Sequence, residues 1–297
     1  MSELPGYLGY RSMAMGIGSL PLNRARSWGD RLGRRLARPG STRFELAKRH
    51  LRRAVGDAAV SDALVVDMFG SYGRYWAEVF WFKPDRANEM FAESETVGLD
   101  PVYRAKEEGR GMVFAVPHVG NWDAAGIVAH RIGIRPLAVA EDLSNRRVTE
   151  WFIDRRRHMG MEVVLADGSR DTVAKLIRHL RGGGAVALPS DRDVTGRGVS
   201  VEFFGEETTM PAGPVALADR TGAALFPVAP YFTDSGYRNV IREELVLGED
   251  GDRQERIARG LTQLAVVFEE MIREQPSQWH LFQPNWPSDL EWLESRP

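Results

Sequence analysis

The segment MVFAVPHVGNWDAAG, residues 112–126, decides how the rest of the sequence is interpreted. Its first five residues are apolar and lie between a glycine and a proline, which predicts a buried strand of a parallel sheet over Met112–Val116. His118 and a glycine-containing turn follow, and Asn121 is a plausible N-cap for the next helix. Open α/β sheets bind ligands outside the carboxyl ends of their strands, so this position favours a functional histidine.

The same segment places a carboxylate near that histidine. Asp123 lies in the first turn of the expected helix, five residues after His118. An imidazole beside a carboxylate can take a proton from a hydroxyl, because the carboxylate fixes the tautomer and stabilises the imidazolium. The alternative is structural: Asp123 favours the positive end of a helix, and His118 is an ordinary turn residue.

Composition limits the classes of protein that remain. The 297 residues are 43% hydrophobic and 27% charged, which is typical of a globular protein and compatible with one large α/β domain. Cysteine is absent, which excludes disulfides, thiolate zinc sites and a catalytic cysteine, and favours an intracellular protein. No uncharged apolar run approaches the roughly 18 residues that span a bilayer.

The amino-terminal part of the chain is basic. Residues 1–54 hold twelve Lys or Arg and three Asp or Glu, whereas the remainder holds 27 and 38. Apolar residues recur at steps of three and four along 22–36, and arginines occupy most of the other face. This pattern predicts a basic amphipathic segment, residues 1–40, that contacts an anionic membrane, followed by a catalytic domain over 41–297. A basic surface helix of the fold is the alternative, and no nucleic-acid reader fold follows the arginines.

Strands and helices alternate along most of the remaining sequence. This alternation predicts an α/β fold, a single domain with a mostly parallel twisted central sheet flanked by helices. A preceding helical stretch, 61–82, is rich in aromatic residues that suit either a core or the wall of an acyl-chain tunnel. The expected strands are 112–116, 137–140, 162–165, 185–188 and 224–230, with 237–246 as an antiparallel edge strand.

Polar residues gather where these strands end. Glu141 and Asp142 follow one strand, and Asp191, Arg192 and Asp193 follow another. Carboxyl ends of parallel strands meet at one edge of a sheet, so these side chains are expected to converge on His118.

A long connection, residues 194–214, separates these polar residues from the next helix. Its length suggests a functional loop, and it carries Phe203. Residues 211–213 then lead into a helix N-terminus, which could accept a phosphate.

Several catalytic motifs are missing from the sequence. There is no G-x-S-x-G elbow, no G-x-x-x-x-G-K-[ST] loop and no H-E-x-x-H motif. A covalent acyl-enzyme therefore has no visible nucleophile.

Motifs in one order along the chain carry a family resemblance. They are PHVGNWD (117–123), SDRD (190–193), FFG (203–205), MPAGPVALA (210–218) followed by TGAALFPV, and QWHLFQPNW (278–286). Together they resemble the bacterial lipid A acyltransferase superfamily, and within it the actinobacterial phosphatidylinositol mannoside acyltransferases.

The resemblance implies a reaction and a location. The reaction is transfer of a palmitoyl-type chain from acyl-CoA, as co-substrate, to a mannose hydroxyl of a phosphatidylinositol mannoside glycolipid. It requires no metal and no resident cofactor. The location is the cytoplasmic face of the plasma membrane, to which such a protein binds peripherally.

The resemblance also assigns residues. His118 matches the catalytic histidine and Asp123 the aspartate of its motif, while Glu141 and Arg156 match substrate-site residues. Asp191 stands where the similar proteins have glutamate. Either Asp191 or Asp123 would orient the His118 ring, and free N–H groups at the Asn121 helix start would stabilise an oxyanion. Further expected binding residues are Arg192, Asp193, Arg197, Phe203 and Arg220.

Arg156 has two arginine neighbours that serve as a comparison. Without the resemblance, Arg156 would be one of a run of solvated arginines with Arg155 and Arg157. We therefore expect replacements at Arg155 and Arg157 to matter little.

Three other functions remain open from the residues. One is an acyltransferase for another glycolipid, and another is a non-catalytic lipid-binding protein on the same fold. The third is a metal-dependent hydrolase that uses His118, Asp123 and Asp191.

Overall fold

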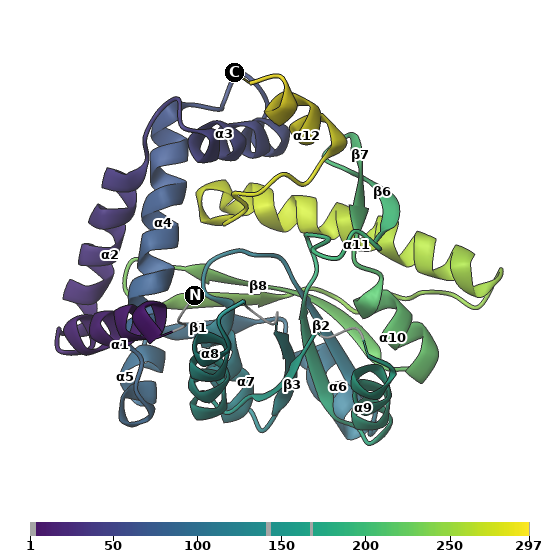
Figure 1. The fold of residues 1–297 in the computed structure, drawn as a ribbon. Coiled ribbons are helices and arrows are strands. Elements are labelled where there is room, and N and C mark those ends of the chain that lie inside the picture. Colours follow the sequence, from purple (N-terminus) through teal and green to yellow (C-terminus); the bar gives the residue numbers. More distant parts are fainter. Residues whose placement is uncertain (1–3, 141–143, 167–168, 297) are drawn as a thin grey trace.

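The computed structural model describes residues 4–140, 144–166 and 169–296, which form an α/β fold around a mostly parallel sheet (Figure 1). Within these residues the strand order is β1-β9-β8-β2-β5-β3-β4, and the β8–β9 pair is antiparallel whereas the other pairs are parallel. The bounds are β1 Ser94–Val97, β2 Met112–Val116, β3 Pro136–Ala140, β4 Glu162–Leu165, β5 Ala185–Pro189, β8 Ala224–Phe232 and β9 Tyr237–Ile241. The predicted fold class and its five parallel-type strands are confirmed.

The central strand β2 is buried on both faces, which explains its unbroken apolar sequence. Val113 and Ala115 pack into one hydrophobic cluster with α9 (Arg170–Arg181), α10 (Gly213–Thr221) and α11 (Arg253–Glu274). Met112, Phe114 and Val116 point to the other face, where α6 (Asp100–Glu107) and α7 (Trp122–Arg131) cover the sheet. Alternate residues of one strand thus serve two layers of helices.

The other helices complete the fold. Their bounds are α1 Leu4–Gly18, α2 Leu22–Leu36, α3 Thr42–Val55, α4 Asp62–Trp81, α5 Ala87–Phe91, α8 Arg146–His158 and α12 Pro287–Glu294, with short 3-10 turns at Pro84–Arg86 and Pro276–Gln278. Figure 1 shows α2 beside α4 at one end of the molecule, with α1 close to α8.

Glycines allow α2 and α4 to touch through their backbones. A Cβ on Gly29 would lie 2.4 Å from the carbonyl oxygen of Gly73, and one on Gly33 would lie 2.0 Å from that of Phe69. Larger residues would therefore push the two helices apart. These two glycines are buried together with Leu22, Ala25 and Arg26, so the predicted apolar stripe of α2 is buried only at its start.

The first two helices share a hydrophobic core with the rest of the chain. Leu22 and Ala25 are buried with residues of α4, β8 and β9, whereas Trp28 and Leu36 of the same helix are 42% and 55% exposed. Arg26, on the expected polar face, is buried and donates to Glu78 at 2.7 Å. Only part of the predicted amphipathic stripe is therefore available for a membrane.

The prediction that residues 237–246 form an edge strand is wrong in two respects. The strand ends at Ile241, and β1 pairs with its outer side as a parallel edge strand. β1 has the sequence SETV and is only half buried, so its polar residues gave no strand signal.

The long connection after Asp193 is an ordered hairpin, not a loop. It contains β6 (Val199–Phe203) and β7 (Glu206–Met210), joined by the two residues Phe204 and Gly205. Both have positive φ, 54° and 74°, as a type I′ turn requires. Phe204 tolerates this conformation because its ring packs on Trp279 at 5.5 Å and its N–H donates to Glu269.

Candidate active site

The turn after β2 is fixed by neighbouring backbone. Gly120 has φ +59°, and a Cβ there would lie 1.9 Å from the carbonyl oxygen of Pro230. The Gly120 N–H donates to the Gln278 carbonyl and the Asn121 N–H to the Pro230 carbonyl, both at 3.0 Å. His118 is therefore held at the carboxyl end of β2, as predicted, between β8 and the carboxyl-terminal segment.

Asp191, at the end of the neighbouring strand β5, holds the His118 ring. Its Oδ1 lies 2.5 Å from Nδ1 of His118, and its Oδ2 accepts the His118 backbone N–H at 3.0 Å. The indole N–H of Trp279 donates to the same Oδ2 at 2.8 Å. Three donors thus fix the carboxylate, and the carboxylate fixes the ring.

The surroundings keep Asp191 ionised. Burial alone would raise the pKa of this carboxyl, but the adjacent His118 ring and the N–H groups of His118 and Trp279 lower it below its ordinary value. A carboxylate on Nδ1 leaves Nε2 as the free nitrogen of a side chain that is 23% exposed. This geometry suits a general base.

The prediction left open whether Asp191 or Asp123 orients His118, and the geometry favours Asp191. The buried Asp123 carboxylate instead accepts the Tyr75 hydroxyl at 2.9 Å and Nε of Arg156 at 2.6 Å. Burial raises the pKa of Tyr75 well above its ordinary value, and Asp123 adds to this effect, so the phenol stays protonated. Asp123 therefore positions Arg156 and Tyr75 beside the histidine.

The arginine run is not uniform. Arg156 is mostly buried at its ion pair with Asp123, whereas Arg157 is exposed. Arg155 donates to the Phe82 carbonyl and lies over the Trp151 ring at 4.8 Å. The expectation that Arg155 is a solvated residue is therefore wrong, and Arg157 is the neutral comparison for Arg156.

A cavity of about 510 Å³ opens beside His118. Its walls are mainly aromatic and aliphatic, and two arginines, Arg156 and Arg192, provide its positive charge. Its lining includes Tyr10, Tyr75, Trp76, Trp122, Val139, Thr149, Phe152, Ile153, Leu188, Asp193 and Pro211. We call this space the catalytic cleft.

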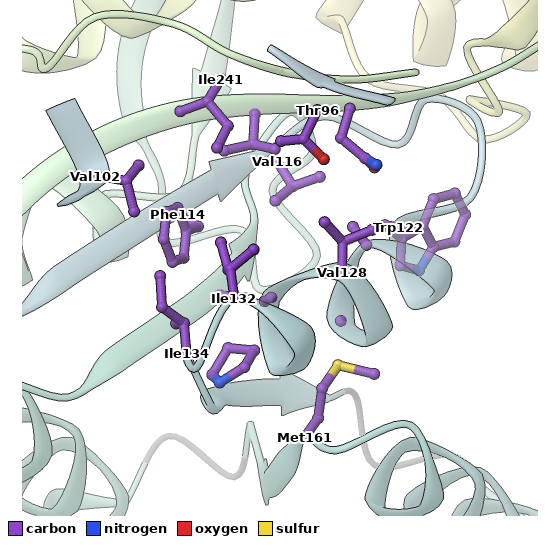
Figure 2. A pocket seen from close by; sticks show the side chains of 17 residues that line it. Thr96, Val102, Phe114, Val116, Trp122, Val128, Ile132, Ile134, Met161 and Ile241 are labelled. Atoms are coloured by element: carbon purple, nitrogen blue, oxygen red, sulfur yellow. The ribbon is translucent and has the colours of Figure 1, made fainter. Parts of the chain in front are cut away.

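A smaller apolar cavity of about 80 Å³ lies behind Trp122, which lines it and the catalytic cleft (Figure 2). Figure 2 shows Val128 of α7, and Ile132 directly after that helix, opposite Phe114 and Val116 of β2. The Trp122 ring in turn contacts His118 edge-on at 5.2 Å.

The structure places the other predicted binding residues of the loop after β5 in different surroundings. Arg192 lines the catalytic cleft, whereas Arg197 is exposed and does not line it. Asp193 also lines the cleft, but its carboxylate accepts the N–H groups of Thr195 and Gly198 and the Thr209 hydroxyl. Asp193 thus holds the loop after β5 and has little capacity left for a ligand.

Two further predicted binding residues do not line the catalytic cleft. Phe203 is fully buried with its ring stacked on Trp286 at 5.8 Å, so it belongs to the core. Arg220 is exposed in the last turn of α10, just before β8 begins, so it lies away from the carboxyl ends of the strands. Glu141 lies outside the residues that the structure describes, as does Asp142.

Most N–H groups of the turn are already bonded, which narrows the predicted oxyanion donors. Gly120 and Asn121 donate to carbonyls, and the Ala124 N–H donates to the Asn121 side chain at 3.0 Å, which confirms Asn121 as the N-cap. The amides of Trp122 and Asp123 remain as candidates for the first turn of α7.

Sequence reasoning missed three residues that support this site. The Trp279 side chain anchors Asp191, and the backbone N–H of His280 donates to the His118 carbonyl at 2.7 Å. Buried Glu78 accepts Nδ2 of Asn121 at 2.7 Å and also binds Arg26 of α2. The QWHLFQPNW motif contains the first two residues, whereas a lone Glu in an aromatic helix gave no signal.

His280 remains neutral beside His118. Burial lowers its pKa to about 3, and the nearby His118 contributes to the shift. Its Nε2 shares a 2.8 Å hydrogen bond with the Ser71 hydroxyl.

Within residues 4–140, 144–166 and 169–296 the structure has neither a metal-binding cluster nor a membrane-spanning helix. In this part of the chain no group of three His, Asp or Glu side chains could hold a metal ion. No helix formed by these residues is long and apolar enough to cross a membrane.

Comparison with known proteins agrees with the motifs. Residues 6–288 match the sequence model of the family described as bacterial lipid A biosynthesis acyltransferase. A phosphatidylinositol mannoside acyltransferase of Mycobacterium tuberculosis (strain CDC 1551 / Oshkosh) is 37% identical over 287 residues, which cover 95% of this chain and 88% of that protein.

Two other relatives extend the comparison. A protein of the same name from Mycolicibacterium smegmatis is 37% identical over 250 residues, covering 83% of this chain and 80% of that protein. A lipid A biosynthesis acyltransferase of Haemophilus influenzae is 28% identical over 167 residues, covering 55% and 51%.

Proposed function

Because the chain belongs to the bacterial lipid A biosynthesis acyltransferase family, we propose that it moves a palmitoyl-type chain from acyl-CoA to a mannose hydroxyl of a phosphatidylinositol mannoside. The observation that carries this proposal is the His118–Asp191 pair at the wall of an apolar cleft. The acceptor is proposed from the 37% identity to mycobacterial proteins named for that acceptor.

His118 acts as the general base in this proposal. Its Nε2 takes the proton of the hydroxyl while the hydroxyl oxygen bonds to the thioester carbon. The carbon–sulfur bond then breaks, and His118 returns the proton to the departing thiolate. A thiol with a pKa near about 8.5 leaves readily, so no covalent acyl-enzyme is needed.

Asp191 has two roles in this mechanism. It keeps the proton of the neutral ring on Nδ1, and it stabilises the imidazolium that forms. The Trp122 and Asp123 amides are the proposed donors to the tetrahedral oxyanion.

Positive side chains and apolar walls suit an acyl-CoA donor. Arg192 is the proposed contact for a phosphate, because it lines the catalytic cleft. Arg156, held by Asp123, presents its remaining N–H groups to the same cleft. The mainly apolar walls of the catalytic cleft, which encloses about 510 Å³, support a fatty chain as the transferred group. Glu141 stays a proposed substrate residue.

A peripheral position on the cytoplasmic face of the plasma membrane fits the outer surface of the first two helices. Exposed Trp28 and Leu36 lie on the same helix as the exposed Arg31 and Arg35. Apolar and basic groups together favour an anionic bilayer surface.

An acceptor panel tests the proposal. Purified protein is incubated with palmitoyl-CoA and, separately, phosphatidylinositol mannoside, a lipid A precursor and no acceptor, and thiol release is measured. Release that requires the mannoside supports the proposal. Release with the lipid A precursor alone indicates the other glycolipid activity, and binding without release with any acceptor indicates a lipid-binding protein.

A further inference from the structure

A second apolar groove lies between α1, α2 and α4, next to the catalytic cleft. It encloses about 800 Å³, and we call it the helical groove. Aromatic residues of α4 form its floor, and Trp28, Leu32 and Leu36 of α2 form one wall. Trp28 and Leu36 are exposed, so the groove is an unfilled apolar surface and not a packing defect.

One end of this groove is positively charged. Arg38 and Arg43 line it, and both side chains are exposed. The Arg43 guanidinium lies over the Phe282 ring at 4.3 Å and the Tyr72 ring at 5.1 Å. Within the described part of the chain neither arginine forms an ion pair, although nearby Arg34 is paired with acidic side chains. A planar donor without a carboxylate suits a phosphate.

The helical groove adjoins the catalytic cleft. Tyr10 and Trp76 line both spaces. Ring contacts also connect them: Tyr72 stacks on Tyr75 at 6.1 Å, Tyr75 on Trp122 at 4.3 Å, and Trp122 touches His118. These aromatic side chains therefore form the boundary between the groove and the cleft that holds the histidine.

The length of the floor suits one fatty chain. Phe80 is eleven positions after Phe69 in α4, which is about 16 Å at roughly 1.5 Å per residue. This length is close to that of the fatty chains in one membrane leaflet, because a leaflet is half of a hydrocarbon core about 30 Å thick.

We propose that the helical groove seats the acceptor phosphoglycolipid: one of its fatty chains lies along α4, its phosphate lies at Arg38 and Arg43, and its sugars reach the catalytic cleft. Such a lipid carries apolar, anionic and sugar parts, which match the apolar groove, its two arginines and the adjoining catalytic cleft. This proposal rests on the proposed function, since it names how the same acceptor is held.

Two glycines of α1 provide a matched test. A Cβ on Gly9 or on Gly16 would meet no atom within 4 Å, so both positions accept a side chain without a clash. Gly9 borders the helical groove, whereas Gly16 is exposed outside it. Gly9→Phe narrows the groove, and Gly16→Phe adds the same apolar ring to the same helix elsewhere. Arg43→Gln and Arg24→Gln form a second pair, because Arg24 is exposed outside the groove.

The kinetic arm compares the diacylated mannoside with its deacylated, water-soluble form. Gly9→Phe should raise KM for the diacylated acceptor about tenfold or more, which corresponds to about 1.4 kcal/mol, and leave KM for the deacylated form unchanged. Arg43→Gln should raise KM for both, since both carry the phosphate. Gly16→Phe and Arg24→Gln should match the wild type. Equal effects of Gly9→Phe and Gly16→Phe would overturn the proposal, since only bilayer partitioning would then have changed.

A binding arm works even if no acceptor is acylated. Trp28 and Trp76 line the groove, so phosphatidylinositol with brominated chains should quench tryptophan fluorescence. Gly9→Phe should weaken this quenching and Gly16→Phe should not. If no acyl group is transferred but the lipid still quenches tryptophan fluorescence and Gly9→Phe weakens that quenching, the proposed function is refuted and the groove proposal stands. Identical quenching of both variants would refute the groove.

Discussion

Replacing Asp191 by asparagine should disable the histidine without removing it. The carboxylate accepts from the His118 backbone at 3.0 Å, from Trp279 at 2.8 Å, and faces Nδ1 at 2.5 Å. An amide has only one oxygen for these donors. If that oxygen keeps the backbone and indole bonds, the NH2 group faces Nδ1 and donates to it. The ring then carries its proton on Nε2 and cannot accept one from a hydroxyl.

The expected loss follows from this tautomer change. The equivalent substitution in a serine protease triad lowers kcat by about 10⁴, so Asp191→Asn should lower kcat by about 10³- to 10⁴-fold. Hydrogen bonding in the buried site becomes imperfect, which should cost about 1–3 kcal/mol of unfolding free energy. Asp123→Asn should have a smaller kinetic effect, about 10- to 100-fold, because it acts through Arg156 and Tyr75.

The assay measures thiol release from palmitoyl-CoA at saturating acceptor, with thermal unfolding of each variant as a control for folding. Asp191→Asn with kcat within about tenfold of the wild type would refute the role of this carboxylate. A larger loss for Asp123→Asn than for Asp191→Asn would show that the hydrogen-bond geometry identifies the wrong orienting residue.

Three further outcomes are expected. Arg156→Lys should lower kcat/KM for acyl-CoA at least about tenfold, because lysine cannot replace a guanidinium that binds Asp123 and also faces the catalytic cleft. The same substitution at exposed Arg157 should have no such effect. Equal effects at both positions would contradict this assignment. Replacing Arg31 and Arg35 by Gln should weaken binding to anionic vesicles by about 2 kcal/mol, roughly thirtyfold, in a low-salt sedimentation assay. Unchanged vesicle binding would mean that the exposed face of α2 does not contact the bilayer. The free energy of unfolding should fall as the pH is lowered from 6.5 to 4, because burial first of all lowers the pKa of His280 to about 3 and of His50 to about 4. The unfolded state then binds more protons than the folded state, and each histidine contributes up to about 1.4 kcal/mol per pH unit. Denaturant titrations in which His280→Gln keeps the same pH slope would contradict this origin of the effect.

The strand–turn–helix unit around His118 could be predicted from sequence because all its signals are local. Five apolar residues, a capping Asn121 and the first turn of α7 are adjacent in the chain, and the structure has each of them as expected. The hairpin β6–β7 could not be predicted in the same way. Its turn is Phe204-Gly205, and a phenylalanine at positive φ is stabilised by Trp279 and Glu269, which are distant in sequence.

The candidate site shows the same division between local and long-range information. Residue types and strand ends brought His118, Asp191 and Arg192 to one cleft. Spacing alone could not decide between Asp123 and Asp191, because the choice depends on how β5 lies beside β2. Phe203 was expected to bind substrate because it lies in the long connection that the sequence suggested was a functional loop, yet its burial against Trp286 is a tertiary contact.

Mass identification of the lipid product tests whether His118 is the general base for palmitoyl transfer to the mannoside. Wild-type protein, His118→Ala and His130→Ala are each incubated with palmitoyl-CoA and phosphatidylinositol mannoside, His130 being an exposed histidine at the far end of α7. With the wild type and His130→Ala we expect a mannoside that has gained one palmitoyl group on a sugar. With folded His118→Ala we expect its rate of formation to decrease by about 10²- to 10⁴-fold. An acylated mannoside formed at the wild-type rate by His118→Ala would contradict it.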